Sequence, residues 1–337
     1  MMSEIEFYWV FRVDSKPKSG GGHMMRSLAL ASVMSKFVKV HFVLDKNSKF
    51  WISKLREKGF SMEVCQGEGF IYTNLLTKEN CLGILIDSYD IPQDEMILWS
   101  HFCNNIAIID DMGLAPDFAN YIISPSIYSQ VLSNNLNQVI MSGPKYALLS
   151  SKYQKNLVEL PASKVKNIFL NFGYFDSNNY LNTALNALEE INFFGNVGIA
   201  IGSKAPYLND IKKIISQFSF NVNLYEDLVG VYELNNEADM VIGSGGVGLL
   251  ERMSLGKPSI TIIASKNQEI QANWATSLGA TFSFNFKKKS ELKSMIEAVQ
   301  MLINNKNIRE NMSRIACNAI DGKGSIRVAD ALLKNKK

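Results

Sequence analysis

A histidine directly after three glycines is the group of this sequence best placed to do chemistry. Residues 12–26 read Arg-Val-Asp-Ser-Lys-Pro-Lys-Ser-Gly-Gly-Gly-His-Met-Met-Arg, between an apolar run at residues 7–11 and a helical pattern. A strand, a glycine loop and a helix in this order point backbone N–H groups at an anion. Gly21 and Gly22 let a ligand approach the backbone closely. We therefore expect His23 at a helix N-terminus, beside the bound ligand.

A plainer alternative explains the same residues as a tight turn between a strand and a helix, with the histidine as a cap. Residues 19–24 lack the G-x-G-x-x-G spacing, so this stretch is not the dinucleotide-binding fingerprint.

A second glycine-rich turn lies in the other half of the chain. Residues 243–252 read Gly-Ser-Gly-Gly-Val-Gly-Leu-Leu-Glu-Arg. Ser244, Gly245 and Gly246 at a helix N-terminus could hold a diphosphate through backbone N–H groups and the helix dipole. Glu251, about two turns into the helix, could accept hydrogen bonds from both hydroxyls of a ribose. No P-loop lysine follows, and a glycine turn with a surface glutamate remains the alternative.

Apolar strand-like runs alternate with helical patterns along the chain. The runs are nearly continuous, which indicates parallel strands covered on both faces. We expect strands at residues 7–11, 38–44, 61–65, 82–87, 106–111 and 121–125 in the first half, the last of these closing it, and at residues 167–172, 197–201, 221–225, 239–243 and 259–263 in the second.

Two successive rounds of strands and helices predict an α/β chain of two doubly wound, parallel-sheet, Rossmann-like domains with a cleft between them. The pattern breaks at residues 126–165, the expected connection. We expect domains at residues 1–150 and 167–337 with a linker at 151–166, and the last helix could return to the first domain. Ligands of such sheets bind at the carboxyl ends of the strands.

Polar residues follow several of these strands, among them Asp87, Tyr89 and the pair Asp110 and Asp111. Paired aspartates could suggest a metal, but aspartates at strand ends commonly cap turns, and we predict no metal site. His41 lies inside an apolar run, which favours a structural role.

Composition excludes several classes of protein. The net charge of +3, from 35 basic and 32 acidic residues, is too balanced for a nucleic-acid-binding protein. The four cysteines are widely spaced, which favours free thiols in a reducing compartment. No signal peptide and no long apolar span are apparent. We expect a cytoplasmic protein without a membrane span; its oligomeric state stays open, with a monomer favoured.

The ordered set of motifs resembles the PseG-type nucleotide-sugar hydrolases of pseudaminic acid biosynthesis, which are relatives of the MurG glycosyltransferases of GT-B fold. The matching segments span nearly the whole chain. They are the segments 12–26, 86–89, 109–111, 143–149, 244–251, 266–268 and 321–328.

The resemblance implies a role for each matching residue. His23 would activate water at the anomeric carbon, with Arg12 and Asp14 orienting the glycine loop and Asp14 also able to position His23. Tyr89 and Asn267 would line the sugar pocket, with Gln268 beside the phosphates or the sugar. The remaining matches form the nucleotide subsite: Ser244, Gly245 and Gly246 at the diphosphate and Glu251 at the ribose.

The implied reaction is hydrolysis of UDP-2,4-diacetamido-2,4,6-trideoxy-β-L-altropyranose into UDP and free sugar, with inversion at the anomeric carbon and without metal or cofactor. A neutral histidine suits the deprotonation of water at neutral pH. Three alternatives stay open. One is a glycosyltransferase that moves the sugar to an acceptor hydroxyl, another is a non-catalytic nucleotide-sugar-binding protein, and a UDP-sugar 2-epimerase fits the motif order less well.

Overall fold

The computed structural model describes residues 6–14, 21–65, 77–89, 91–125, 137–154, 161–286 and 290–334. The chain forms two compact units, each considered by itself below. Unit 1 comprises Met1–Ser150 and Lys323–Lys337, and unit 2 comprises Ser151–Gly322. The described part of the segment 151–166, expected as a linker, groups with unit 2, where Tyr153 and Val165 are buried.

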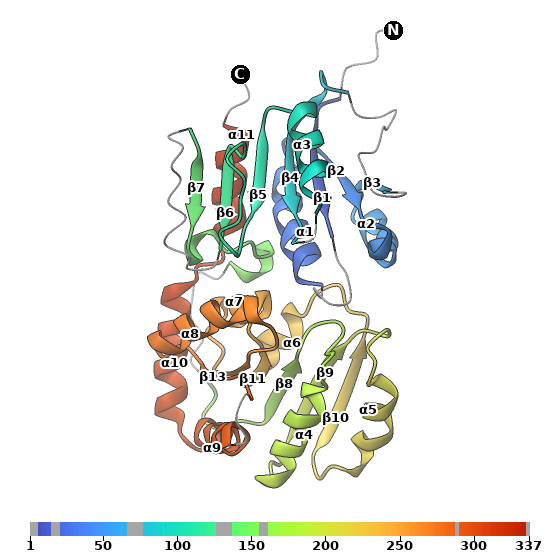
Figure 1. Cartoon of the computed structure of the whole chain (residues 1–337). Helices are drawn as coiled ribbons and strands as arrows, with labels where there is room; N and C mark the ends of the chain where they lie inside the picture. Colours follow the sequence, from blue (N-terminus) through green and yellow to red (C-terminus); the bar gives the residue numbers. More distant parts are fainter. Residues whose placement is uncertain are drawn as a thin grey trace. The chain divides into compact units, whose positions relative to one another are not determined.

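Unit 1 is built on a seven-stranded sheet in which every paired strand is parallel, in the order β3-β2-β1-β4-β5-β6-β7 (Figure 1). From β1 the chain runs outward through β2 to β3, then crosses to β4 on the other side of β1 and continues to β7. The strands are β1 (Tyr8–Val13), β2 (Lys39–Leu44), β3 (Ser61–Val64), β4 (Cys81–Asp87), β5 (Ile106–Ile109), β6 (Tyr121–Ser124) and β7 (Val139–Ser142).

Helices cover both faces of this sheet. Side chains alternate along β1: Trp9 and Phe11 pack with α1 and α11, whereas Tyr8 and Val10 pack on the opposite face with Trp99 of α3. The described helices are α1 (Gly22–Met34), α2 (Ile52–Glu57), α3 (Gln93–Phe102) and α11 (Gly324–Leu333), with 3-10 turns η1 (Lys46–Trp51) and η2 (Pro144–Tyr146). Burial on both faces explains why the inner strands β1, β4 and β5 are almost continuously apolar.

The start of α11 is tightly packed within unit 1. A Cβ on Gly324 would lie 2.2 Å from the carbonyl oxygen of Ala147, so the backbones approach each other at a distance that only glycine allows. Ser325 is fully buried, and its hydroxyl donates to the carbonyl oxygen of Leu149 at 2.8 Å. These contacts position α11 against α1.

Unit 2 repeats the architecture with six parallel strands in the order β10-β9-β8-β11-β12-β13 (Figure 1). The strands are β8 (Asn167–Asn171), β9 (Asn196–Ile201), β10 (Asn221–Glu226), β11 (Met240–Ser244), β12 (Ser259–Ile262) and β13 (Phe282–Phe284). Helices α4, α5 and α9 cover one face and α6 the other. The helical segments are η3 (Ser151–Tyr153), α4 (Tyr180–Glu190), α5 (Leu208–Ile214), η4 (Ile215–Gln217), α6 (Tyr232–Glu237), α7 (Val247–Ser254), η5 (Lys266–Gln268), α8 (Glu269–Leu278), α9 (Ser290–Asn304) and α10 (Lys306–Ala319).

The prediction of two doubly wound parallel sheets is confirmed, but the expectation that the strand at residues 121–125 closes the first half was wrong. β7 follows it and pairs in parallel with β6. This strand has only four residues, and Val139 is 46% exposed. A short, half-exposed edge strand carries too weak an apolar pattern to be recognised. The strand β13 and the helix α10 were also missed.

Candidate functional site

His23 is the second residue of α1, directly after Gly22. Arg26 and Ser27, three and four residues further on, lie on the same side of the helix. All three side chains meet Asp87, the last residue of β4. The cluster therefore forms where β4, beside β1 in the sheet, ends next to the start of the first helix.

Asp87 is the centre of this cluster and is fully buried. Its carboxylate accepts hydrogen bonds from Arg26 Nε at 2.8 Å and Arg26 Nη2 at 2.6 Å, and from Ser27 Oγ at 2.9 Å. Burial opposes ionisation of Asp87, but the charge of Arg26 and the neighbouring His23 outweigh it and hold its pKa below the ordinary value. Asp87 is therefore a carboxylate at neutral pH.

The imidazole of His23 is oriented by the same carboxylate. Its Nδ1 lies 3.1 Å from Asp87 Oδ1 and 3.3 Å from the carbonyl oxygen of Asp87, two acceptors. Neutral His23 must therefore carry its proton on Nδ1, which leaves the lone pair on Nε2. Within the part of the chain that the structure describes, Nε2 is buried and has no hydrogen-bond partner. This nitrogen is arranged to accept a proton.

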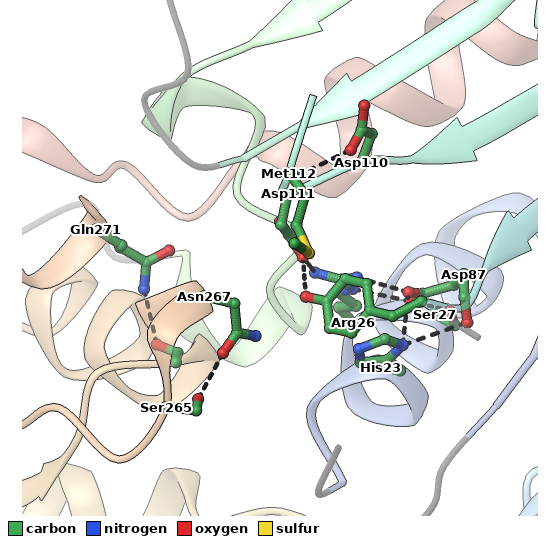
Figure 2. A network of polar contacts seen from close by, with 12 residues as sticks. His23, Arg26, Ser27, Asp87, Asp110, Asp111, Met112, Ser265, Asn267 and Gln271 are labelled. Atoms are coloured by element: carbon green, nitrogen blue, oxygen red, sulfur yellow. Dashed lines mark hydrogen bonds and ion pairs between the residues drawn. The ribbon is translucent and has the colours of Figure 1, made fainter. Parts of the chain in front are cut away.

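Two more residues complete the cluster: Asp111, beside Arg26 in Figure 2, and Tyr89. The Tyr89 hydroxyl donates to Asp111 Oδ2 at 2.5 Å, and Arg26 Nη1 donates to the same oxygen at 2.5 Å. The ring of Tyr89 meets the His23 ring edge to face, with centroids 4.3 Å apart. Because Tyr89 is 37% exposed, it borders both His23 and solvent.

Arg12 and Asp14 form a separate buried cluster at the end of β1. Arg12 Nε donates to Glu95 Oε1 at 2.6 Å, and Arg12 Nη1 pairs with Asp14, which also accepts from the Ser88 hydroxyl. The sequence left Asp14 able to position His23, but the carboxylate that lies at His23 Nδ1 is that of Asp87. Sequence reasoning could not rank the two aspartates, because both end strands beside the glycine loop.

The glycine loop itself is described only in part. Gly21 precedes α1 as its cap residue without a side-chain bond, and Gly22 is the first helical residue. Residues 15–20, including the first of the three glycines, lie outside the described residues. Asp110 caps the turn after β5, as expected: its carboxylate accepts backbone N–H bonds from Met112, Gly113 and Ala115 at 2.8–2.9 Å.

In unit 2, the turn of Ser244, Gly245 and Gly246 joins β11 to α7. Gln268 fixes this turn to the neighbouring loop, since its Oε1 accepts from the N–H of Gly245 at 3.1 Å and of Ala264 at 3.0 Å. The structure therefore brings together four predicted residues, the three of the turn and Gln268.

Two residues absent from the sequence prediction also contact the turn. Gln271 Nε2 donates to the carbonyl oxygens of Gly245 and Gly246, and Arg252 donates to that of Ser244. Gln271 lies more than 20 residues from the turn, and Arg252, although it ends the 243–252 segment, contacts a backbone oxygen eight residues before it, which no residue pattern indicates.

Glu251 is buried within unit 2 rather than on its surface. It lies one turn before the end of α7 and hydrogen-bonds with Tyr153, whose hydroxyl also accepts from Asn235 Nδ2 at 3.4 Å. Burial raises the pKa of Glu251 to about 7, against the opposing effects of Tyr153 and Arg252. The carboxyl group of Glu251 is therefore poised between its two protonation states near neutral pH.

Asn267 lies on the surface of unit 2, in the short turn η5. The hydroxyl of Ser265 donates to Asn267 Oδ1 at 2.5 Å (Figure 2). This contact orients the amide at the carboxyl end of β12.

Among the described residues, no group of three or more histidine, cysteine or acidic side chains could hold a metal ion. In the part of the chain that the structure describes, the four cysteines, Cys65, Cys81, Cys103 and Cys317, form no disulfide. None of the described helices is both long and apolar enough to cross a membrane.

Comparison with curated sequences finds distant relatives, and no protein-family model matches the chain. An uncharacterized protein of Methanocaldococcus jannaschii is 23% identical over 268 residues, covering 76% of this chain and 55% of its own length, so this chain spans about half of that relative. The spore coat polysaccharide biosynthesis protein SpsG of Bacillus subtilis is 20% identical over 327 residues, 95% of this chain and 96% of that protein. A UDP-2,4-diacetamido-2,4,6-trideoxy-beta-L-altropyranose hydrolase of Campylobacter jejuni is 23% identical over 283 residues, 82% and 99% of the two chains.

Solved structures show the same fold over nearly the whole chain. MurG of Acinetobacter baumannii aligns with a TM-score of 0.66 and 11% identity, covering 98% of this chain and 99% of its own. The MnaA protein of S. aureus, solved with UDP, aligns with a TM-score of 0.64 and 12% identity, covering 97% of this chain and 96% of its own. The fold is therefore of the GT-B type, as expected.

Proposed function

We propose that this chain hydrolyses a UDP-activated sugar at its anomeric carbon. The observation that carries the proposal is His23, whose Nδ1 is held by the Asp87 carboxylate while its buried Nε2 has no partner in the described part of the chain. A base held in one tautomer by a carboxylate is the arrangement that deprotonates water or a hydroxyl group. Tyr89, beside the imidazole, would contact the sugar.

The nucleotide assignment is supported by the turn of unit 2. Its backbone N–H groups at the N-terminus of α7 suit a diphosphate, and the carboxyl group of Glu251 on the same helix suits the hydroxyls of a ribose. The substrate class is further supported by the Campylobacter jejuni relative, named as a hydrolase of a UDP-linked diacetamido sugar, and by the MnaA structure solved with UDP.

In the proposed mechanism, His23 Nε2 takes a proton from water as the water oxygen attacks the anomeric carbon. The bond from that carbon to the β-phosphate oxygen breaks, and UDP leaves with the bonding electron pair. Attack opposite the leaving group inverts the anomeric centre. The turn N–H groups would stabilise the charge that develops on the β-phosphate, so little acid catalysis is needed.

The test is UDP release from UDP-2,4-diacetamido-2,4,6-trideoxy-β-L-altropyranose without an acceptor. We expect His23→Gln to lower kcat at least 100-fold, the scale of a lost general base, while UDP affinity stays within about twofold. His41→Gln is the matched control, because His41 is another buried histidine of unit 1, on β2, that contacts Ser61. Equal rates for wild type and His23→Gln would contradict the assignment of His23.

Transfer to an acceptor hydroxyl is the second candidate, since the solved structures of this fold include MurG and other glycosyltransferases. The same histidine would then deprotonate the acceptor. UDP that is released only when an acceptor is added, with none released in water, would favour the transferase over the hydrolase.

A further inference from the structure

We propose that Arg252 and Gln271 are positioning residues that hold the glycine turn of unit 2 in the shape that binds a diphosphate. The inference rests on the proposed function, which takes this turn as the diphosphate subsite. Hydrogen bonds from these two side chains preorganise the turn before the ligand binds.

Three consecutive carbonyl groups of the turn are held by these two side chains. Arg252 Nη1 donates to the carbonyl oxygen of Ser244 at 3.0 Å. Gln271 Nε2 donates to the carbonyl oxygens of Gly245 at 2.8 Å and Gly246 at 2.9 Å. Figure 2 shows the Gln271 amide directed at a backbone oxygen. The three carbonyl oxygens of the turn therefore have hydrogen-bond donors within the protein.

The N–H groups of the same peptides must point the opposite way. A trans peptide is planar and places its N–H opposite its C=O. The first peptide shows this directly, because its N–H, that of Gly245, donates to Gln268 Oε1. By the same geometry, the carbonyl bonds to Gln271 direct the N–H groups of Gly246 and Val247 away from Gln271. Successive N–H groups on one side of a turn make an anion-binding concavity.

Arg252 also supplies a fixed positive charge beneath this concavity. It is 2% exposed, and its Nη2 donates to Thr261 Oγ1 at 2.7 Å. A Cβ on Gly243 or Gly248 would lie 3.3 or 3.7 Å from Arg252 Nη1, so the guanidinium lies directly under the turn backbone.

The charge state of this guanidinium favours an anion. Burial lowers the pKa of Arg252 to about 9, which still leaves it protonated at neutral pH. Its hydrogen bonds to Ser244 and Thr261 end on neutral oxygens, and its buried Nε has no partner among the described residues. The neighbouring Glu251 carries only part of a negative charge near pH 7, because its pKa is about 7. A diphosphate would supply the missing countercharge.

The experiment compares UDP with uridine, measured by calorimetry and by ligand-observed NMR. Arg252→Met removes the charge and the donors, and Gln271→Leu removes the amide that orients two peptides. Each variant is expected to weaken UDP binding about tenfold or more, the scale of lost charged or buried hydrogen bonds, and to leave uridine binding unchanged. Gln271→Leu carries the test if Arg252→Met fails to fold.

Arg309→Met is the matched control. Arg309 is equally buried in unit 2 and donates to backbone carbonyls, those of Leu302, Ile303, Ala162 and Ser163. It should lower stability and leave the ratio of UDP to uridine affinity unchanged.

Two results would overturn the inference: UDP affinity within twofold of wild type in both variants, or parallel loss of UDP and uridine. Failure of the wild-type protein to bind UDP would instead overturn the proposed function, so the two failures are distinguishable.

Discussion

At the scale of single residues, the arrangement around His23 depends on one carboxylate with several partners. Asp87 accepts two hydrogen bonds from Arg26 and one from Ser27, and it also holds His23 Nδ1. Arg26 keeps this carboxylate ionised and in place. The remaining nitrogen of the guanidinium, Nη1, pairs with the Asp111 carboxylate. The imidazole is therefore oriented by a fully buried carboxylate that is itself held by Arg26 and Ser27.

Replacing that carboxylate by an amide should impair catalysis more than binding. Asp87→Asn can present an N–H to Nδ1, which favours the wrong imidazole tautomer. We expect kcat to fall by about two orders of magnitude or more, with UDP affinity nearly unchanged. Steady-state kinetics and UDP titration measure this split.

Asp110→Asn is the matched control for Asp87→Asn, because Asp110 is a buried strand-end aspartate that caps only the turn after β5. It should lower stability and leave kcat unchanged. An Asp87→Asn enzyme with wild-type kcat would remove Asp87 from the mechanism.

At the scale of elements, the carboxyl ends of the parallel strands carry the polar clusters. β4 ends in Asp87, β11 ends in Ser244, and α1 and α7 each begin directly after a glycine. Parallel strands align these ends on one edge of each sheet, as the topology rule for open α/β sheets requires. The strands that carry these clusters were therefore predictable from the sequence, whereas the pairing of individual side chains was not.

Close packing at the start of α11 gives a test at this scale. Gly324→Ala places a methyl group 2.2 Å from a backbone oxygen of Ala147, which cannot move without displacing the turn η2. We expect a loss of about 1–3 kcal/mol, typical of overpacking, in urea-induced unfolding. Gly198→Ala is the control, because its Cβ would meet its nearest neighbour at 3.7 Å. Equal stability of the two variants would argue against this close contact.

At the scale of the whole molecule, α11 completes the core of unit 1. Val328, Ala329 and Leu332 of α11 are buried in the same core as Leu28 of α1. Residues 300 or more positions apart in the numbering, such as Leu28 and Val328, thus share one core, which links the folding of unit 1 to α11.

This connection predicts which unit a core mutation affects. Leu332→Ala should destabilise unit 1 by about 2–5 kcal/mol, seen in fluorescence-detected unfolding because Trp9, Trp51 and Trp99 lie in unit 1 and Trp274 in unit 2. Leu302→Ala, in the α9 core of unit 2, is the counterpart and should lower the stability of unit 2 instead. No change in unfolding for Leu332→Ala would contradict the role of α11.

The sequence alone determined the α/β class, the two rounds of parallel strands and the glycine turns that precede two helices, because apolar periodicity and glycine are local signals. It did not reveal β7 or β13, whose short runs carry little periodicity. Only the tertiary structure decided that Asp87 rather than Asp14 holds His23, and that Arg252 and Gln271 hold the turn of unit 2. The physical reason is that Asp87 and Gln271 are distant along the chain from the residues they hold, and Arg252 reaches Ser244, eight residues earlier, only because α7 packs against β11. Strand order and helix packing set these partners.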